Sequence, residues 1–231
     1  MKYNKIKFFN LILCLLVSIK VSAQECDYTM RVLTYPQKEE IPNSVIDMLN
    51  TRLSTAVSNC GIVISNQYSQ FFITAKFNHV TEDIVPGPPK QFAVHTILTL
   101  LIGNPEGQEI YSSKSFDLRG IGNSNQRALI NSFQKINAKN NEFNDFIDKG
   151  KKKIIDYYNT NYAQILDKAN KALILKKYDE ALYYACSIPE CCNGYSKAVE
   201  DIINIFNKYI EYDGEILYKK AYAAWSINPT Q

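Results

Sequence analysis

The first half of the chain alternates between strand-like and helix-like patterns of apolar residues. Residues 27–35 are rich in Tyr, Thr and Val, which favours a strand, and residues 71–77 alternate apolar and polar positions as a half-buried strand does. Between them, apolar residues recur at helical spacing from Pro42, which suits a first turn, to Gly61, which suits a helix end. The helix is expected to bury Val45, Leu49, Leu53, Ala56 and Val57. The short apolar run 62–65 predicts one further strand.

A long hairpin and a second helix are predicted next. The turn-forming residues 86–89 precede residues 91–104, which are apolar on both faces, as expected of a central strand. Residues 108–118 predict another strand, and Asn123 with Gln126 resembles a capping box at the start of a helix. That helix is expected to bury Leu129, Phe133 and Ile136. The order β-α-β-β-β-β-α predicts an α+β fold, in which a small mixed sheet carries two helices.

The second half of the chain is predicted to be entirely helical. Residues 137–143 are polar and turn-rich, and we place a domain boundary there. Apolar residues beyond it form two seams at spacings of three and four. The seams are Tyr158, Tyr162, Ile165, Ala169 and Ala172, and then Tyr195, Ala198, Val199, Ile202, Phe206 and Tyr209. We therefore expect an α/β domain at 24–137 and an all-α domain at 138–231.

The helical half contains a weak internal repeat. The segment YDEALYY, which begins at Tyr178, returns as YDGEILY at Tyr212, an offset of 34 residues that equals the tetratricopeptide period. Residues 172–189 also resemble the second half of a tetratricopeptide unit, with a short break at the YDEA corner. This half is predicted to hold two degenerate tetratricopeptide-like units, with an ordinary four-helix tail as the alternative.

Residues 1–23 have the pattern of a signal peptide. Three early lysines precede the apolar run 8–19, and Val21 and Ala23 are the small residues that signal peptidase requires. The segment carries four lysines and no acidic residue, so its removal changes the formal net charge from +3 to −1. The remaining charge favours neither nucleic acid nor an anionic membrane as a partner. We expect an exported protein of the periplasm or cell surface, without a transmembrane segment after cleavage.

Five of the six cysteines follow the signal peptide, which in an oxidising compartment suggests two disulfides and one thiol. Cys26 and Cys60 each precede a strand, and the two strands flank one helix. A right-handed β-α-β unit would place these strand starts side by side, so Cys26 is predicted to pair with Cys60. Cys186 is predicted to pair with Cys191 or Cys192, across the turn between two helices.

The sequence predicts no catalytic, cofactor or metal site. His79 and His95 are the only histidines, and they are equidistant from Gly87 at the predicted hairpin tip. An antiparallel hairpin would bring them nearly opposite each other, but two ligands are too few for a zinc site. We expect exposed strand positions there. Because the motifs of common nucleophilic, nucleotide-binding and metal-dependent enzymes are absent from the sequence, we do not expect an enzyme.

The first half resembles a group of bacterial envelope domains. The group includes the amino-terminal domain of TolB, the penicillin-binding-protein activator LpoB and the core of the curli-secretion lipoprotein CsgG. The resemblance is carried by residues 53–65, 71–77 and 111–136, and it covers about 27–137. It implies an adaptor or a pore subunit of the envelope. The chain departs from the lipoproteins because no cysteine follows a lipobox.

Together these features predict an exported, non-catalytic adaptor that binds a protein partner or itself. The last predicted helix, 215–226, has no capping helix after it, so Tyr218, Tyr222 and Trp225 are expected to form a docking surface. One alternative is an envelope glycan-binding protein or hydrolase that uses the hairpin face near His79 and His95. Another is a structural subunit of a larger assembly.

Overall fold

A computed structural model describes residues 26, 29–37, 41–65, 69–105 and 107–227. The predicted signal peptide, 1–23, lies outside them. The elements in chain order are β1 Thr29–Thr34, α2 Asn43–Ser58, β2 Val63–Ile64, β3 Phe71–Val85, β4 Gln91–Asn104, β5 Glu109–Gly122, α3 Asn125–Ser132, a 3-10 turn Phe133–Lys135, α4 Asn141–Ile174, α5 Tyr178–Cys186 and α6 Tyr195–Ile227. Among the described helices, none has both the length and the apolar character needed to cross a membrane.

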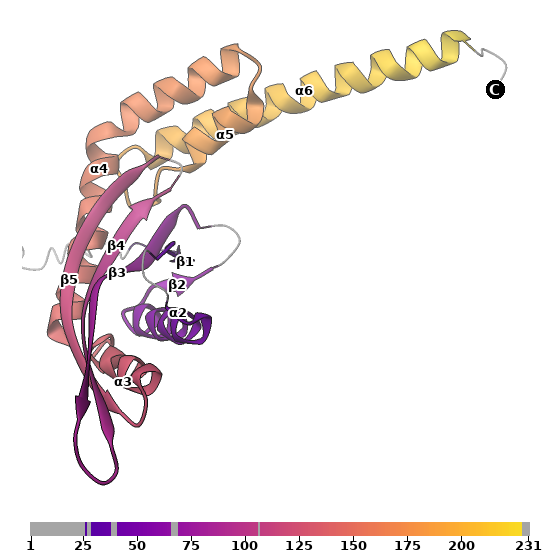
Figure 1. Cartoon of the computed structure of the whole chain (residues 1–231). Coiled ribbons are helices and arrows are strands. Elements are labelled where there is room, and N and C mark those ends of the chain that lie inside the picture. Colours follow the sequence, from indigo (N-terminus) through magenta and orange to yellow (C-terminus); the bar gives the residue numbers. More distant parts are fainter. Residues whose placement is uncertain (1–25, 27–28, 38–40, 66–68, 106, 228–231) are drawn as a thin grey trace, which may run out of the picture.

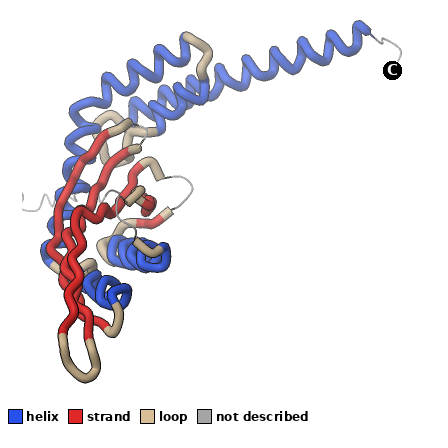
Figure 2. Tube along the Cα trace, viewed as in Figure 1, coloured by secondary structure: helices blue, strands red, loops and turns tan. Residues whose placement is uncertain are grey.

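The predicted order of strands and helices is confirmed, and the fold is α+β. One mixed sheet has the strand order β2-β1-β3-β4-β5. Strand β1 pairs in parallel with β2 and β3, whereas β3, β4 and β5 form an antiparallel meander. Figure 1 shows the sheet curving along α4, with α2 and α3 beside it and the β3–β4 hairpin extending past them. Figure 2 shows the strands gathered in one part of the molecule, with helices alone forming the long extension at the other end.

Helix α2 buries the face that its sequence predicts. The five predicted residues are at most 2% exposed. The turn that follows the helix ends at Gly61, whose φ of 76° is a left-handed conformation that glycine adopts without steric cost. The sheet and α2 therefore share one apolar core.

Helix α3 begins one residue later than a capping box at Asn123 requires. Its cap is Ser124, whose hydroxyl accepts a hydrogen bond from the Arg127 backbone N–H at 3.2 Å. Serine is an equally good capping residue, so the choice between neighbouring polar residues depends on where β5 ends. The prediction of Asn123 as the cap is wrong. The predicted core residues Leu129, Phe133 and Ile136 are buried.

The two faces of the sheet differ in character. On one face, Phe116 of β5 packs against Phe143 and Phe146 of α4, with ring centroids 6.5 and 6.3 Å apart. On the other face, one hydrogen bond of 2.7 Å joins the hydroxyl groups of Thr99 in β4 and Ser115 in β5. Alternate residues of β4 are buried, and those between them are half-buried. One face of the sheet therefore carries the core, and the other is polar.

The helical half contains one of the two predicted corners. Helix α4 ends at Ile174, a three-residue break follows, and α5 begins at Tyr178, so the break lies just before the YDEA segment rather than at it. Helix α6, however, continues without a break through Tyr212–Gly214, where the second corner was expected. The two segments therefore differ in structure, and the helices do not confirm a tetratricopeptide repeat. Because α6 is one continuous helix, its last residues cannot pack against the residues in its middle.

Candidate functional site

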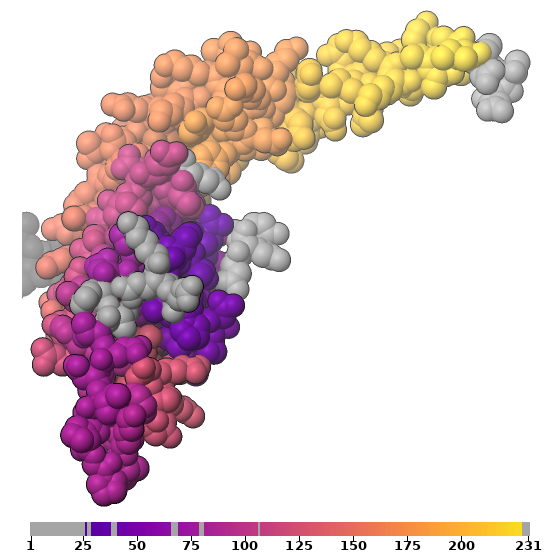
Figure 3. All heavy atoms as spheres, viewed as in Figure 1, coloured from indigo at the N-terminus to yellow at the C-terminus, as the bar shows by residue number. Residues whose placement is uncertain are grey.

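The first half of α6 packs against the rest of the helical region. Ala198, Asp201 and Ile205 are its buried residues. The ring of Tyr209 stacks on Tyr178 of α5 at 5.2 Å, and Tyr212 lies 5.3 Å from the same ring. Beyond Tyr212, Ile216 is half-buried and every other described residue of the helix is exposed. Figure 3 shows this outer half of α6 extending away from the molecule.

A second face of α6 is apolar and uncovered. Its large side chains recur at helical spacing on both halves of the helix, and each is between 51% and 58% exposed. We call this surface the exposed stripe. It consists of Ile203, Phe206, Ile210, Leu217 and Trp225, with the small residues Gly214, Ala221 and Ala224 between them. None of these positions carries a charge, so the stripe is continuous along the helix.

The three predicted docking residues lie on the projecting half of α6. Tyr218 is 69% exposed, and Tyr222 and Trp225 are each 57% exposed, so Trp225 is not internal. The rings of Tyr218 and Tyr222 stack at 6.3 Å, and those of Tyr222 and Trp225 lie 6.0 Å apart. They form the aromatic edge of the exposed stripe. Tyrosine and tryptophan suit a protein interface, because their rings bury apolar area while the tyrosine O–H and the tryptophan N–H can still form hydrogen bonds.

Sequence reasoning missed the inner part of the stripe. Phe206 was assigned to the packed seam, yet it is 51% exposed. Ile203, Ile210 and Leu217 are seven residues apart, which places them on one face of a continuous helix. This spacing could have revealed the stripe, had the helix not been expected to break at Tyr212.

The predicted cysteine pairs are both wrong. Cys26 forms a disulfide with Cys191, with Cα atoms 5.4 Å apart. Cys60, Cys186 and Cys192 are free thiols in the described part of the chain. Burial raises the pKa of the Cys192 thiol to about 11, so it stays protonated at neutral pH.

The predicted strand placement is nevertheless confirmed, because β1 and β2 are parallel neighbours. Cys60 lies in the turn after α2, where its thiol donates a hydrogen bond to the Asn144 side chain of α4 at 3.2 Å. Burial raises the pKa of this thiol. Cys26 instead reaches the loop between α5 and α6. The disulfide therefore joins the start of the described chain to its helical half.

The backbone register does not pair the two histidine positions with each other. It pairs His79 with Ile97 and His95 with Thr81, because the strand pairing ends at Val85 and Gln91, which centres the turn on Pro88 rather than on Gly87. The His95 ring contacts Asp117 instead, with Nε2 3.1 Å from Oδ2, and this hydrogen bond lowers the pKa of the carboxyl group. The described residues contain no cluster of three or more His, Cys, Asp or Glu side chains that could hold a metal ion.

Comparison with known proteins gives only distant structural likenesses. No family model matches the chain, and no curated protein matches it. A minor lipoprotein from Acinetobacter baumannii is 14% identical over 53% of this chain and 94% of its own, with a TM-score of 0.34. A protein from Xanthomonas campestris is 11% identical over 58% of this chain and 91% of its own, with a TM-score of 0.39. A PelC dodecamer from Paraburkholderia phytofirmans is 11% identical over 48% of this chain and 87% of its own, with a TM-score of 0.35. No family assignment follows from these likenesses.

Proposed function

We propose that the protein is an exported, non-catalytic adaptor of the cell envelope, and that it binds a partner protein through the exposed stripe of α6. The observation that carries this proposal is the continuity of the stripe. From Ile203 to Trp225 it extends about 33 Å at the rise of an α-helix. Export rests on the signal-peptide pattern of residues 1–23.

Burial of the stripe would supply the free energy of binding. Apolar area removed from water contributes about 25 cal/mol per Å², and each large side chain of the stripe is more than half exposed. On the projecting half of α6, every described residue beyond Tyr212 except Ile216 is exposed, so a partner can approach it from several sides. A groove that accepts an amphipathic helix is the partner surface that fits this shape. Trp225 and Leu217 are the expected anchors, because large side chains dominate such interfaces.

Site-specific photo-crosslinking in the native envelope tests this proposal. A photo-reactive residue replaces Leu217 in the stripe or, as a matched control, Lys219 on another face of the same helix turn. We expect one discrete heterologous adduct from position 217 and none from position 219. In binding to the purified partner, Leu217→Glu should weaken affinity at least tenfold, because a charge would then enter an apolar interface.

Three outcomes would contradict the adaptor. Equal adducts from both positions would mean that the helix has no specific partner face. A complete lack of adducts from position 217 would mean that the stripe is unoccupied. Adducts that join only two copies of the chain would assign the stripe to self-assembly and favour a structural subunit.

A further inference from the structure

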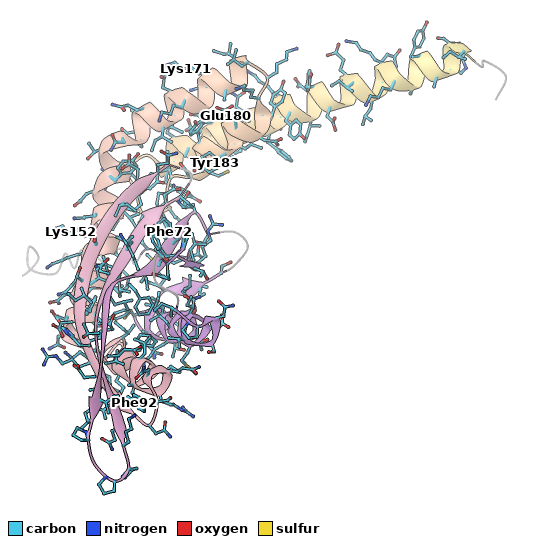
Figure 4. The ribbon with its side chains drawn as sticks, viewed as in Figure 1. Phe72, Phe92, Lys152, Lys171, Glu180 and Tyr183 are labelled. Carbon is cyan, nitrogen blue, oxygen red and sulfur yellow. A yellow bond between two sulfur atoms is a disulfide. The ribbon has the colours of Figure 1, made fainter. Side chains whose placement is uncertain are left out.

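A tyrosine-rich pocket lies where the sheet meets the helical half, away from the projecting part of α6. It has a volume of about 220 Å³. Its walls come from the β4–β5 turn, from α4 and from α5, and Figure 4 shows Tyr183 of α5 close to the ends of the long strands. Five tyrosines line it: Tyr111, Tyr157, Tyr158, Tyr183 and Tyr184.

The inner tyrosines form a packed aromatic wall. The ring of Tyr157 meets Tyr111 edge to face at 5.4 Å and Tyr158 at 5.2 Å. Tyr111 is 6% exposed, and burial raises the pKa of its hydroxyl, which the neighbouring Tyr158 raises further, so it stays protonated at any physiological pH. Tyr157, by contrast, is half-buried and presents the accessible part of this wall to a ligand.

The pocket also offers charged hydrogen-bonding groups of both signs. Glu109 of β5 and Lys168 of α4 both line it, and no ion pair joins them in the described structure. The Lys168 ammonium lies 5.8 Å from the centre of the Tyr184 ring. Both Tyr157 and Glu109 line the pocket, and the negative charge of Glu109 adds to burial in raising the pKa of the Tyr157 hydroxyl. A ligand here would meet an anionic acceptor and a cationic donor.

These features select among ligand classes. An apolar ligand would cover the exposed charged groups of Glu109 and Lys168 without replacing the hydrogen bonds that they make to water, which costs free energy. A simple ion would make no use of the aromatic walls. A sugar ring combines C–H faces, which pack on aromatic rings, with hydroxyl groups, which both donate and accept hydrogen bonds. The volume is below the roughly 300 Å³ at which pockets for drug-sized ligands begin, so it suits one ring.

We propose that the pocket binds one pyranose unit, either a free monosaccharide or the end of a glycan. The carboxylate of Glu109 accepts hydrogen bonds from sugar hydroxyls, and Lys168 donates one. Tyr157 contributes both its hydroxyl and part of the aromatic wall. The site is independent of the exposed stripe. It also differs from the hairpin face at His79 and His95, where sequence reasoning placed a possible glycan site.

Titration of the full ¹⁵N-labelled chain tests this proposal. The probes are D-glucose, D-galactose and N-acetyl-D-glucosamine, added separately and followed by amide chemical shifts. We expect saturable shifts at residues of the β4–β5 turn and at Tyr157 for at least one sugar. The expected Kd is in the millimolar range, which corresponds to a binding free energy of about −4 kcal/mol. Glu109→Gln and Tyr157→Phe should each weaken that binding about tenfold, the loss expected for one hydrogen bond to a charged or buried group.

Tyr218→Phe is the matched control, because it removes a tyrosine hydroxyl from α6 and should leave sugar binding unchanged. The proposal is wrong if no sugar gives a saturable shift up to about 100 mM, well above a millimolar Kd. It is equally wrong if both pocket variants bind as the parent does. Saturation by glycine betaine, with no response to the sugars, would reassign the pocket to small zwitterions. Because the pocket is separate from the exposed stripe, a failure of α6 to bind a partner would not change the expected sugar titration.

Discussion

At the scale of single residues, two glycines in the helical half have opposite environments. A Cβ atom at Gly194 would collide with the ring of Tyr162, whereas a Cβ at Gly214 would meet nothing within 4 Å. Gly194→Ala should therefore destabilise the protein by about 1–3 kcal/mol, because α4 must move away from the loop before α6. Urea unfolding followed by circular dichroism measures this change. An unchanged unfolding midpoint would mean that α4 and this loop do not pack as the structure shows.

Gly214→Ala is the converse substitution at the same scale. Glycine inside an exposed helix costs about 1 kcal/mol relative to alanine, and Gly214 lies in the middle of α6. The variant should raise helicity at 222 nm and slow amide exchange on both sides of position 214. If helicity falls instead, the chain bends at this glycine, and the predicted corner at Tyr212 regains support.

At the scale of elements, α6 is one helix with two different roles. Its first half is held by Tyr178, which stacks on Tyr209 and lies against Tyr212. Its second half has little contact with the body of the molecule. Deleting residues 214–231 should therefore leave the melting temperature within a few degrees of the parent, since the removed side chains that the structure describes are all exposed except half-buried Ile216.

Tyr209→Ala serves as the contrasting variant for the same helix. It removes a half-buried ring from a stack and should cost about 1–3 kcal/mol, which calorimetry would detect as a lower melting temperature. Should the deletion lower the melting temperature more than this substitution does, the outer half of α6 would be a structural part of the fold. The exposed stripe would then be covered in solution.

At the scale of the whole molecule, the Cys26–Cys191 disulfide connects positions 165 residues apart. Closing a loop of this length constrains the unfolded chain, an effect worth up to about 5 kcal/mol in the chain-entropy account. Cys191→Ser should therefore lower the free energy of unfolding by as much as that. Non-reducing peptide mapping of exported protein should recover Cys26 linked to Cys191.

Cys186→Ser is the control for this experiment, since Cys186 is an exposed thiol in the structure. Its unfolding free energy should match that of the parent. Recovery of Cys26 linked to Cys60, or of Cys186 linked to Cys191, would restore the pairing that sequence reasoning favoured. The loop before α6 would then be free of the amino-terminal segment.

The sequence by itself determined the features that depend on local periodicity. The five apolar residues of α2 recur at helical spacing and are all buried. The alternation in β3 and the turn before β4 likewise determined the hairpin. Such patterns are readable because a helix or strand places its side chains by backbone geometry alone, whatever it packs against. The α+β order follows from the same local rules.

Only the tertiary structure decided which distant residues meet. Cys26 pairs with Cys191 because the chain brings two remote segments together, which no spacing along the sequence reveals. The hairpin turn is centred on Pro88 rather than on Gly87, which shifts the register so that the two histidine positions are not paired. The tyrosine pocket draws its walls from three separate segments, and the exposed stripe exists because α6 passes through Gly214 unbroken. Contacts between remote segments depend on the packing of the whole core, whereas propensity and periodicity report only on neighbours along the chain.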